Sequence, residues 1–334
     1  MCEIADIEIY LPEKILSNSD LEKIFKDWSK EKIYEKTGIL ERRIVSNNET
    51  AADLGYKAAN KLLNKRNIRN KVDFLIFCTQ APDYILPTSA CILQERLNLP
   101  TSCGAFDINL GCSGYVYGLS IANALIKSNL ANNVLLITSD TYSKYINEKD
   151  KSVRTLFGDA ASASLIVRSS GASEMTNFDF GTDGKGAQNL IVPSGLFRIP
   201  RTKKTSEIYT DISGNERSSD NLYMNGPEIL SFTLREVPKS IHKVMNSANW
   251  EYKDIDLFLL HQANTFLLKT LAKKMRISPE KLPIYLEKVG NTVSSSIPIL
   301  MSKLYKSGRL ERGNKLILSG FGVGYSWASC SLIF

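Results

Sequence analysis

Short apolar runs alternate with amphipathic stretches along most of the chain, and this alternation is typical of an α/β protein. The run at 72–79 is almost continuously apolar, as in a strand whose sheet is covered on both faces. The full pattern predicts strands at 1–10, 72–79, 104–109, 133–139, 255–260 and 315–320, a strand within 156–167, an apolar end at 328–334, and helices at 19–28, 50–62, 87–97, 112–128, 227–247, 264–275 and 291–307.

Two segments depart from this pattern. From about 171 to 221, Gly, Ser, Thr and charged residues dominate, so we predict an irregular insert. Near the end of the chain, glycines recur at every second position, which indicates a backbone that passes very close to another segment. The insert carries a basic cluster that is most simply a solvated loop, made of Arg198, Arg201, Lys203 and Lys204.

Part of the chain is repeated. Residues 111–128 align without a gap with 290–307, and this register places Cys112 on Asn291. The apolar runs that precede and follow these segments also match in order, which indicates an internal duplication. With 334 residues, 43% of them apolar, the chain can form two fused halves. We predict an N-terminal half at 1–170 and a C-terminal half at 171–334.

Composition argues against several classes of protein. There are 42 basic and 35 acidic residues, and the net charge of +7 suits an anionic partner or substrate. The chain has no zinc, helix-turn-helix or RNA-binding motif, so we expect no nucleic acid partner. No apolar run approaches the roughly 18 residues of a membrane span, and the first residues do not resemble a signal peptide. Six cysteines without a CxxC pair favour reduced thiols in a cytoplasmic protein.

Cys112 is the candidate nucleophile. It follows the apolar run at 104–109 and begins a segment in which apolar residues recur at helical spacing. A thiol at the start of a helix faces free N–H groups and the positive end of the helix dipole. Both are expected to lower its pKa towards the reactive thiolate. The alternative is an ordinary buried cysteine without a chemical role.

His261 and Asn291 are the candidate partners of this cysteine. His261 ends an apolar run, and Asn291 lies in a Gly-Asn-Thr turn. Each residue alone could be structural, the first as a core histidine and the second as a turn former. The duplication, however, brings the ends of the corresponding strands together, and open α/β sheets bind their ligands at strand ends. We therefore expect Cys112, His261 and Asn291 to meet near a shared pseudo-twofold axis.

Several motifs around these residues occur in a fixed order. The strongest are Asn-Leu-Gly-Cys-Ser-Gly at 109–114, His-Gln-Ala-Asn at 261–264, Gly-Asn-Thr at 290–292 and Gly-Phe-Gly-Val-Gly-Tyr-Ser-Trp at 320–327. The ordered set resembles the β-ketoacyl-acyl-carrier-protein synthase III family of the thiolase superfamily. This resemblance implies a layered αβαβα fold, a homodimer, and chemistry that needs no metal or redox cofactor.

The resemblance also implies roles for these residues. Cys112 would take an acyl group from acyl-CoA or an acyl carrier protein, and malonyl carrier protein would then lose CO₂ and condense with it. His261 and Asn291 would donate hydrogen bonds to the enolate, a task that suits two neutral donors. The oxyanion hole for the acyl carbonyl would comprise the N–H of Cys112 and the turn Gly322, Val323 and Gly324.

Substrate contacts implied by the resemblance are less regular. The implied positions are Lys32, Lys36, Leu86, Asn264 and Phe321 for substrate, and Lys273, Lys274 and Arg276 for docking of acyl carrier protein. The family commonly has tryptophan and arginine near Lys32 and Lys36, an aromatic residue at Leu86, and arginine at Phe266. A lysine cannot stack on an adenine, so the acyl donor could be held differently. The basic helix end at 273–276 could equally be a solvated terminus.

Three other functions remain open at this point. A relative of the same fold could transfer the acyl group to an oxygen or nitrogen acceptor without decarboxylation. A cysteine hydrolase could be built around the Gly-Cys-Ser-Gly motif at 111–114. A catalytically inactive scaffold could bind carrier protein through the basic helix end.

Overall fold

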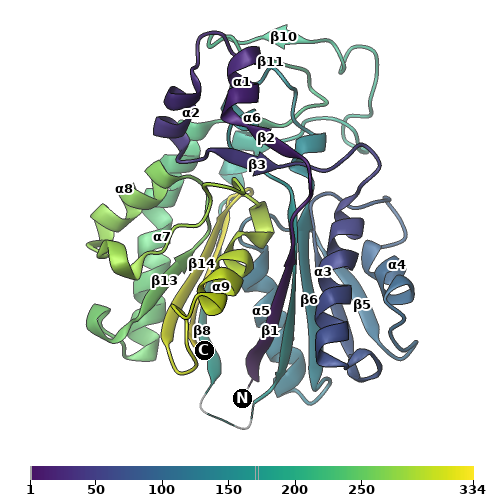
Figure 1. Ribbon diagram of the computed structural model, residues 1–334, viewed down its shortest axis with the longest axis vertical. Helices are drawn as coiled ribbons and strands as arrows, with labels where there is room; N and C mark the ends of the chain where they lie inside the picture. Colours follow the sequence, from purple (N-terminus) through teal and green to yellow (C-terminus); the bar gives the residue numbers. More distant parts are fainter. Residues whose placement is uncertain (1, 170, 172) are drawn as a thin grey trace.

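Two β-sheets, with helices between them and on their outer faces, form the body of the molecule (Figure 1). The computed structural model describes residues 2–169, 171 and 173–334. The first sheet has the order β1-β7-β6-β4-β5, and the second has the order β13-β14-β15-β8. Their strands are β1 (Cys2–Tyr10), β4 (Phe74–Cys78), β5 (Gly104–Ile108), β6 (Asn133–Asp140), β7 (Ala160–Arg168), β8 (Glu174–Thr182), β13 (Leu257–Leu260), β14 (Lys315–Gly322) and β15 (Ser326–Ile333).

Helices cover the outer face of each sheet. The first sheet packs against α3 (Ala51–Arg66) and α4 (Ser89–Arg96), and the second against α7 (Gly226–Ala248) and α8 (Thr265–Met275). The start of α3 follows from its sequence, because Thr50 and Asp53 form a reciprocal capping box. The apolar face predicted for this helix is fully buried. Its burial against the sheet, rather than helix propensity, is what stabilises such a helix.

The central layer contains α5 (Gly114–Lys127) and α9 (Ser296–Lys306), which share one hydrophobic core with both sheets. The molecule therefore has the order helices, sheet, helices, sheet, helices (Figure 1). This arrangement confirms the predicted layered αβαβα fold.

The two sheets repeat one pattern of strand directions. In the first sheet, β4 is parallel to β6, and β7 and β1 follow antiparallel. In the second, β13 is parallel to β14, and β15 and β8 follow antiparallel. The turns before α5 and α9 contain Cys112 and Asn291, so the repeated segments occupy corresponding places. The predicted boundary of the halves falls beside residue 170, which lies outside the described residues, and the exact division stays a prediction.

A smaller cap of short elements lies over the strand ends (Figure 1). The β10–β11 hairpin is at the top of this view, near the helices of the N-terminal segment. The elements of the cap are β2 (Ile15–Ser17), β3 (Glu41–Arg43), β9 (Leu190–Ile191), β10 (Tyr209–Thr210), β11 (Glu216–Arg217), β12 (Tyr223–Met224), α1 (Asn18–Ile24), α2 (Lys30–Thr37) and α6 (Lys151–Arg154).

Two predicted elements need correction. The segment 171–221 is not irregular throughout, because Glu174–Thr182 forms β8 at the edge of the second sheet. The helix expected at 19–28 ends at Ile24, and Phe25 caps it with its backbone N–H. Trp28 therefore lies beyond the helix, in the connection to α2. The second difference matters for the cavity described below, because Trp28 lines it.

Candidate active site

Cys112 lies in the turn between β5 and α5, two residues before the helix begins. The C-terminal part of β14 passes directly against this turn. A Cβ atom added at Gly320 would lie 2.6 Å from the carbonyl oxygen of Cys112, and one at Gly322 would lie 3.0 Å from its Sγ. Only glycine lets the strand approach so closely. The prediction of a close backbone approach is confirmed at these two positions.

The pKa of the Cys112 thiol is not lowered in the free protein. Burial, followed by the charge of Asp140, raises this pKa to about 12. The backbone N–H groups of Cys112 and Val323 act in the opposite direction but do not outweigh burial. The prediction of a lowered thiol pKa is therefore wrong for the free protein. Burial of the sulfur destabilises the thiolate more than the N–H groups at the start of the helix stabilise it.

His261 follows β13 and is buried. Its Nδ1 lies 2.7 Å from the Ser296 hydroxyl oxygen, which also accepts the backbone N–H of Gln262. Because this oxygen already accepts one hydrogen bond, its own proton is free to be donated to Nδ1. Such a contact leaves the proton of the neutral ring on Nε2. Burial lowers the pKa of His261 to about 3, so the imidazole is neutral at physiological pH.

Asn291 is held in place by its backbone and its side-chain oxygen. Its N–H donates to the Leu156 carbonyl at 2.8 Å, and its carbonyl accepts from Gly158 at 2.9 Å. The N–H of Val293 donates to Oδ1 of Asn291 at 3.0 Å. With Oδ1 occupied, the side-chain NH₂ group remains as the donor. The turn thus presents a neutral hydrogen-bond donor.

One cavity of about 390 Å³ contains all three predicted residues, Cys112, His261 and Asn291. Its wall is mainly apolar and includes Phe157, Leu190, Met224 and Phe321. Among the described residues that line it there is no Asp or Glu. The prediction that these three side chains meet at one place is therefore confirmed as geometry.

The other predicted substrate residues divide into two groups. Lys36, Asn264, Phe321 and Gly322 line the cavity, and so does Phe266. Asn264 also caps α8, because its side chain accepts the N–H of Leu267 at 2.8 Å. The second group does not line the cavity and comprises Lys32, Leu86, Val323, Gly324, Lys273, Lys274 and Arg276. The last three are at the C-terminal end of α8.

Two residues of the cap that line the cavity were not foreseen as site residues. Trp28 lines the cavity, with the Nζ atoms of Lys32 and Lys36 at 5.6 and 5.4 Å from its ring centre. Lys151 lines it as well and forms an ion pair with Asp27 at 2.5 Å. The sequence pattern predicts Trp28 as the last residue of a helix at 19–28, and Lys151, the first residue of the four-residue helix α6, has no motif around it. Only the fold brings them together.

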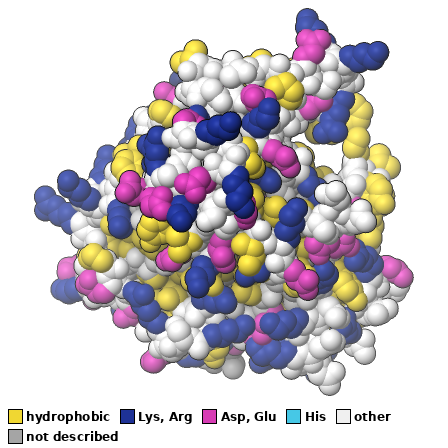
Figure 2. Space-filling view, turned by 45° about the horizontal axis from the view of Figure 1, so that its top comes forward, with side chains coloured by type: hydrophobic (Ala, Val, Ile, Leu, Met, Phe, Trp, Pro, Cys, Tyr) yellow, Lys and Arg dark blue, Asp and Glu magenta, His cyan; other side chains and the backbone are white. Residues whose placement is uncertain are grey.

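Charge around the site is mixed. Figure 2, which brings the cap towards the viewer, shows Lys and Arg side chains dispersed among Asp and Glu over this face. In the part of the chain that the structure describes, His, Cys, Asp and Glu side chains form no cluster that could hold a metal ion. Over the same residues, no helix has the length and apolar character needed to cross a membrane.

Comparison with known proteins agrees with this geometry. Residues 106–184 match the family description 3-oxoacyl-[acyl-carrier-protein] synthase III, and residues 245–334 match its C-terminal part. A β-ketoacyl-[acyl-carrier-protein] synthase III of Chlamydia caviae is 39% identical over 325 residues, covering 97% of this chain and 94% of the relative. One of Caldanaerobacter subterraneus subsp. tengcongensis is 35% identical over 321 residues, with coverages of 96% and 94%.

Solved structures give the same result. A crystal structure of a 3-oxoacyl-(acyl-carrier-protein) synthase III has a TM-score of 0.98 at 52% identity, covering 100% of this chain and 99% of that chain. The 3-oxoacyl-(acyl-carrier protein) synthase of Burkholderia xenovorans LB400 has a TM-score of 0.91 at 40% identity, with coverages of 99% and 93%. The layered fold, the motifs at its strand ends and these full-length similarities together establish that the chain belongs to the β-ketoacyl-acyl-carrier-protein synthase III family.

Proposed function

We propose that the chain catalyses the decarboxylative condensation of an acyl thioester with malonyl-acyl carrier protein to give a 3-ketoacyl product. The observation that carries this proposal is a single cavity with one thiol, one neutral imidazole and one carboxamide, and with no carboxylate among its described lining residues. His261 is a poor general base for hydrolysis of a thioester, because its pKa is about 3 and no carboxylate lines the described cavity wall to stabilise an imidazolium. Two neutral donors instead suit a developing enolate.

In the first half-reaction, Sγ of Cys112 attacks the acyl carbonyl carbon. A new C–S bond forms, the bond to the carrier sulfur breaks, and the thiol proton ends on the departing carrier. Because the free thiol is protonated, no separate thiolate accumulates before attack. The N–H groups of Cys112 and Val323, which already oppose the raised pKa of the sulfur, are suited to bind the carbonyl oxygen. The backbone of Gly322 and Gly324 flanks this donor.

In the second half-reaction, the bond between the malonyl methylene carbon and its carboxylate breaks, and CO₂ leaves. The electron pair moves into an enolate whose oxygen accepts hydrogen bonds from Nε2 of His261 and from the amide of Asn291. The enolate carbon then bonds to the acyl carbon, the bond to Cys112 breaks, and the released thiolate takes a proton from water. The protein's own residues suffice for these steps, and we propose that no metal or redox cofactor takes part.

The carrier arm of each substrate would enter on the side of the cavity that is lined by Trp28, Lys36 and Lys151. This side is called the mouth below. Lys36 and Lys151 supply positive charge there, and Trp28 supplies an apolar platform. Ammonium groups bind phosphate well, and both coenzyme A and the carrier-protein arm contain phosphate. Lys32, Asn264 and Phe321 are further candidates for contact with the arm or the acyl group. We propose that the exposed end of α8, with Lys273, Lys274 and Arg276, docks the acidic carrier protein.

A homodimer is part of the proposal. Its support is the edge position of β5, which has β4 as its only neighbour in the sheet of the described residues, and the 79% exposure of Leu86 in the connection from β4 to α4. This connection reaches β5, because the backbone N–H of Ser89 donates to the side chain of Asp107. An unpaired edge strand is a ready surface for a second copy. In that arrangement Leu86 would reach the partner's acyl cavity.

Intact-protein mass spectrometry tests the function. A panel of acyl-CoA and acyl-carrier-protein thioesters should add an acyl mass to Cys112, and malonyl carrier protein should discharge it as a 3-ketoacyl product. Discharge only by a hydroxyl or amine acceptor, with unchanged acyl length, would instead indicate an acyltransferase.

Asn291→Asp should slow decarboxylation by roughly a hundredfold or more, while self-acylation of Cys112 changes less. Equal losses in both steps would contradict the role of Asn291.

A further inference from the structure

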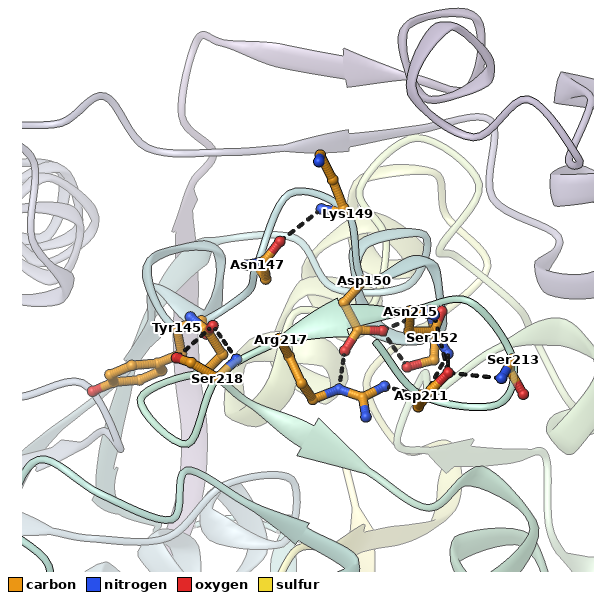
Figure 3. A network of polar contacts seen from close by, with 11 residues as sticks. Tyr145, Asn147, Lys149, Asp150, Ser152, Asp211, Ser213, Asn215, Arg217 and Ser218 are labelled. Carbon is orange, nitrogen blue, oxygen red and sulfur yellow. Dashed lines mark hydrogen bonds and ion pairs between the residues drawn. The ribbon is translucent and has the colours of Figure 1, made fainter. Parts of the chain in front are cut away.

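The β10–β11 hairpin is joined to the cavity mouth through one buried side chain. Figure 3 shows the guanidinium group of Arg217, in β11, between the carboxylates of Asp150 and Asp211. Its Nε donates to Asp150 at 2.6 Å, and its Nη2 donates to Asp211 at 2.7 Å. The Arg217 side chain is only 3% exposed, and that of Asp150 is fully buried. The cation is thus enclosed between two acids rather than solvated.

Asp150 also bonds to Ser152 in the wall of the cavity. The carboxylate oxygen that does not bind Arg217 accepts the backbone N–H of Ser152 at 3.0 Å and the Ser152 hydroxyl at 2.5 Å. These bonds cap α6, whose first two residues, Lys151 and Ser152, both line the cavity. One carboxylate therefore holds the hairpin with one oxygen and the mouth with the other.

Other contacts brace the same connection from both sides. Lys149 and Glu216 form an ion pair at 3.1 Å, and the backbone N–H of Glu216 donates to the Lys149 carbonyl. On the opposite side, the ammonium group of Lys151 pairs with Asp27, next to Trp28 at the mouth. These contacts link the hairpin to α6, and α6 to the connection between α1 and α2 that contains Asp27 and Trp28.

The hairpin is itself folded around the second acid of the pair. Asp211 accepts hydrogen bonds from the backbone N–H groups of Ser213 and Asn215, at 2.8 and 3.0 Å, and from the Asn215 amide. The ring of Tyr223 lies 5.3 Å from the guanidinium carbon of Arg217. The turn at 211–215 therefore presents Arg217 in a fixed orientation, and a planar fork of donors holds both carboxylates at once.

We infer that Arg217 is a positioning residue that holds Lys151 and Ser152 at the mouth, where the phosphate-bearing arm of the thioester substrate passes. The inference rests on the proposed function. Arg217 does not line the cavity and touches no reacting atom. Its effect should therefore fall on substrates that have a long carrier arm, and should spare those that reach Cys112 without one. A purely structural role would affect both kinds of substrate equally.

Acylation of Cys112 by two kinds of donor tests this inference. Acetyl, butyryl and hexanoyl groups are offered on coenzyme A and on N-acetylcysteamine, which lacks the phosphates, and single-turnover rates are followed by intact mass. Arg217→Lys keeps the charge but loses the fork that joins the two acids. Acylation by acyl-CoA at subsaturating concentration should fall roughly tenfold to a hundredfold, and acylation by the truncated donors should stay within about twofold of wild type.

Two further variants sharpen the comparison. Asp150→Asn keeps an oxygen that can cap α6 but removes the charge that Arg217 binds, so it should give the same selective loss. Arg198→Lys, at an exposed arginine of the same insert, serves as the matched control and should leave both rates unchanged. Equal losses with both donors, or no loss with acyl-CoA, would overturn the inference. A wild-type protein that no donor acylates would instead overturn the proposed function, and this inference with it.

Discussion

Asp140 is the charged side chain that most affects the nucleophile. It ends β6, and burial raises its own pKa to about 7. One carboxylate oxygen accepts the N–H of Gln80 at 2.8 Å, and the other accepts the Ser294 hydroxyl at 2.5 Å. Apart from burial, its negative charge is the cause that raises the pKa of Cys112. Burial, and after it this charge, therefore keep the thiol protonated in the free protein.

Replacing Asp140 by Asn should make Cys112 more acidic. Without the carboxylate charge, the thiolate is less disfavoured, and its pKa should fall by about one unit. The measurement is the pH dependence of alkylation by iodoacetamide in a Cys91→Ser background, because Cys91 is the exposed cysteine. Glu13→Gln, at an exposed position, is the control. An unchanged or upward-shifted alkylation profile would contradict this electrostatic account.

His261 should not titrate near neutral pH. Its folded-state pKa of about 3 lies far below its ordinary value of 6.5, because the ring is buried. The chain has two histidines, so His242→Gln leaves His261 as the only imidazole signal in an NMR titration. We expect that signal to stay constant between about pH 8 and pH 5. A midpoint near 6.5 in the folded protein would show that the ring is not held neutral.

The same residue makes the fold sensitive to acid. Below about pH 6.5 the unfolded chain binds a proton at His261 and the folded chain does not, so its contribution to stability is lost as pH falls towards 3. The loss is roughly 1.4 kcal/mol for each pH unit in that window. In the His242→Gln background, His261→Gln should flatten this part of the dependence of unfolding free energy on pH, measured by urea denaturation.

At the scale of elements, strand β14 passes so close to the turn that contains Cys112 that no side chain fits between them. Gly322→Ala would place a methyl group 3.0 Å from both Cβ and Sγ of Cys112. Such a contact is closer than van der Waals packing allows, so the turn or the strand must shift. We expect acylation of Cys112 to fall by roughly a hundredfold, measured by single-turnover mass spectrometry.

Gly184 offers the matched control for this substitution. A Cβ atom there would meet no atom within 4 Å. Gly184→Ala should therefore leave acylation of Cys112 unchanged. If both alanine variants acylate Cys112 equally slowly, the close approach of β14 to Cys112 is not the reason why glycine is needed at position 322.

Elements with strong periodicity were predictable, and those at the margins were not. Strand β4 is buried along most of its length and helix α3 along one face. Their sequences therefore show a continuous apolar run and a helical period of apolar residues, respectively. Strand β8 has Met175 as its one buried residue, and an edge strand with one contact face leaves little hydrophobic signal. Helix α1 ends at Ile24, where the Phe25 N–H bonds to the Leu21 carbonyl, and Trp28 beyond it lines the cavity.

At the scale of the whole molecule, β5 is one of the four edge strands of the two main sheets. Strand β5 pairs with β4 alone, and in the connection from β4 to α4 the side chains of Leu86, Ile85 and Tyr84 are 79%, 68% and 61% exposed. Consecutive exposed apolar residues together with an unpaired sheet edge are unusual in a monomer. The second copy proposed above would cover both features.

The oligomeric state tests this arrangement. Size-exclusion chromatography with light scattering should give twice the mass of one chain. Leu86→Glu would bury a carboxylate against the partner, so it should weaken the dimer. Ile212→Glu, at a fully exposed apolar residue in the turn between β10 and β11, serves as the control and should leave the mass unchanged. A monomeric wild-type protein would contradict the proposal.

The sequence by itself determined the α/β pattern, the duplication, and the meeting of Cys112 with His261 and Asn291. These follow from local periodicity and from register, because each side chain's place on a strand or helix is set by its neighbours in the chain. The layered order of sheets and helices was implied only by the resemblance of the ordered motifs to a known family. Only the tertiary structure decided the protonation of the thiol, the residues at the mouth, and the link from Arg217 to α6. Desolvation and the effect of Asp140 depend on groups far apart in sequence, and such energies exist only once the chain has folded.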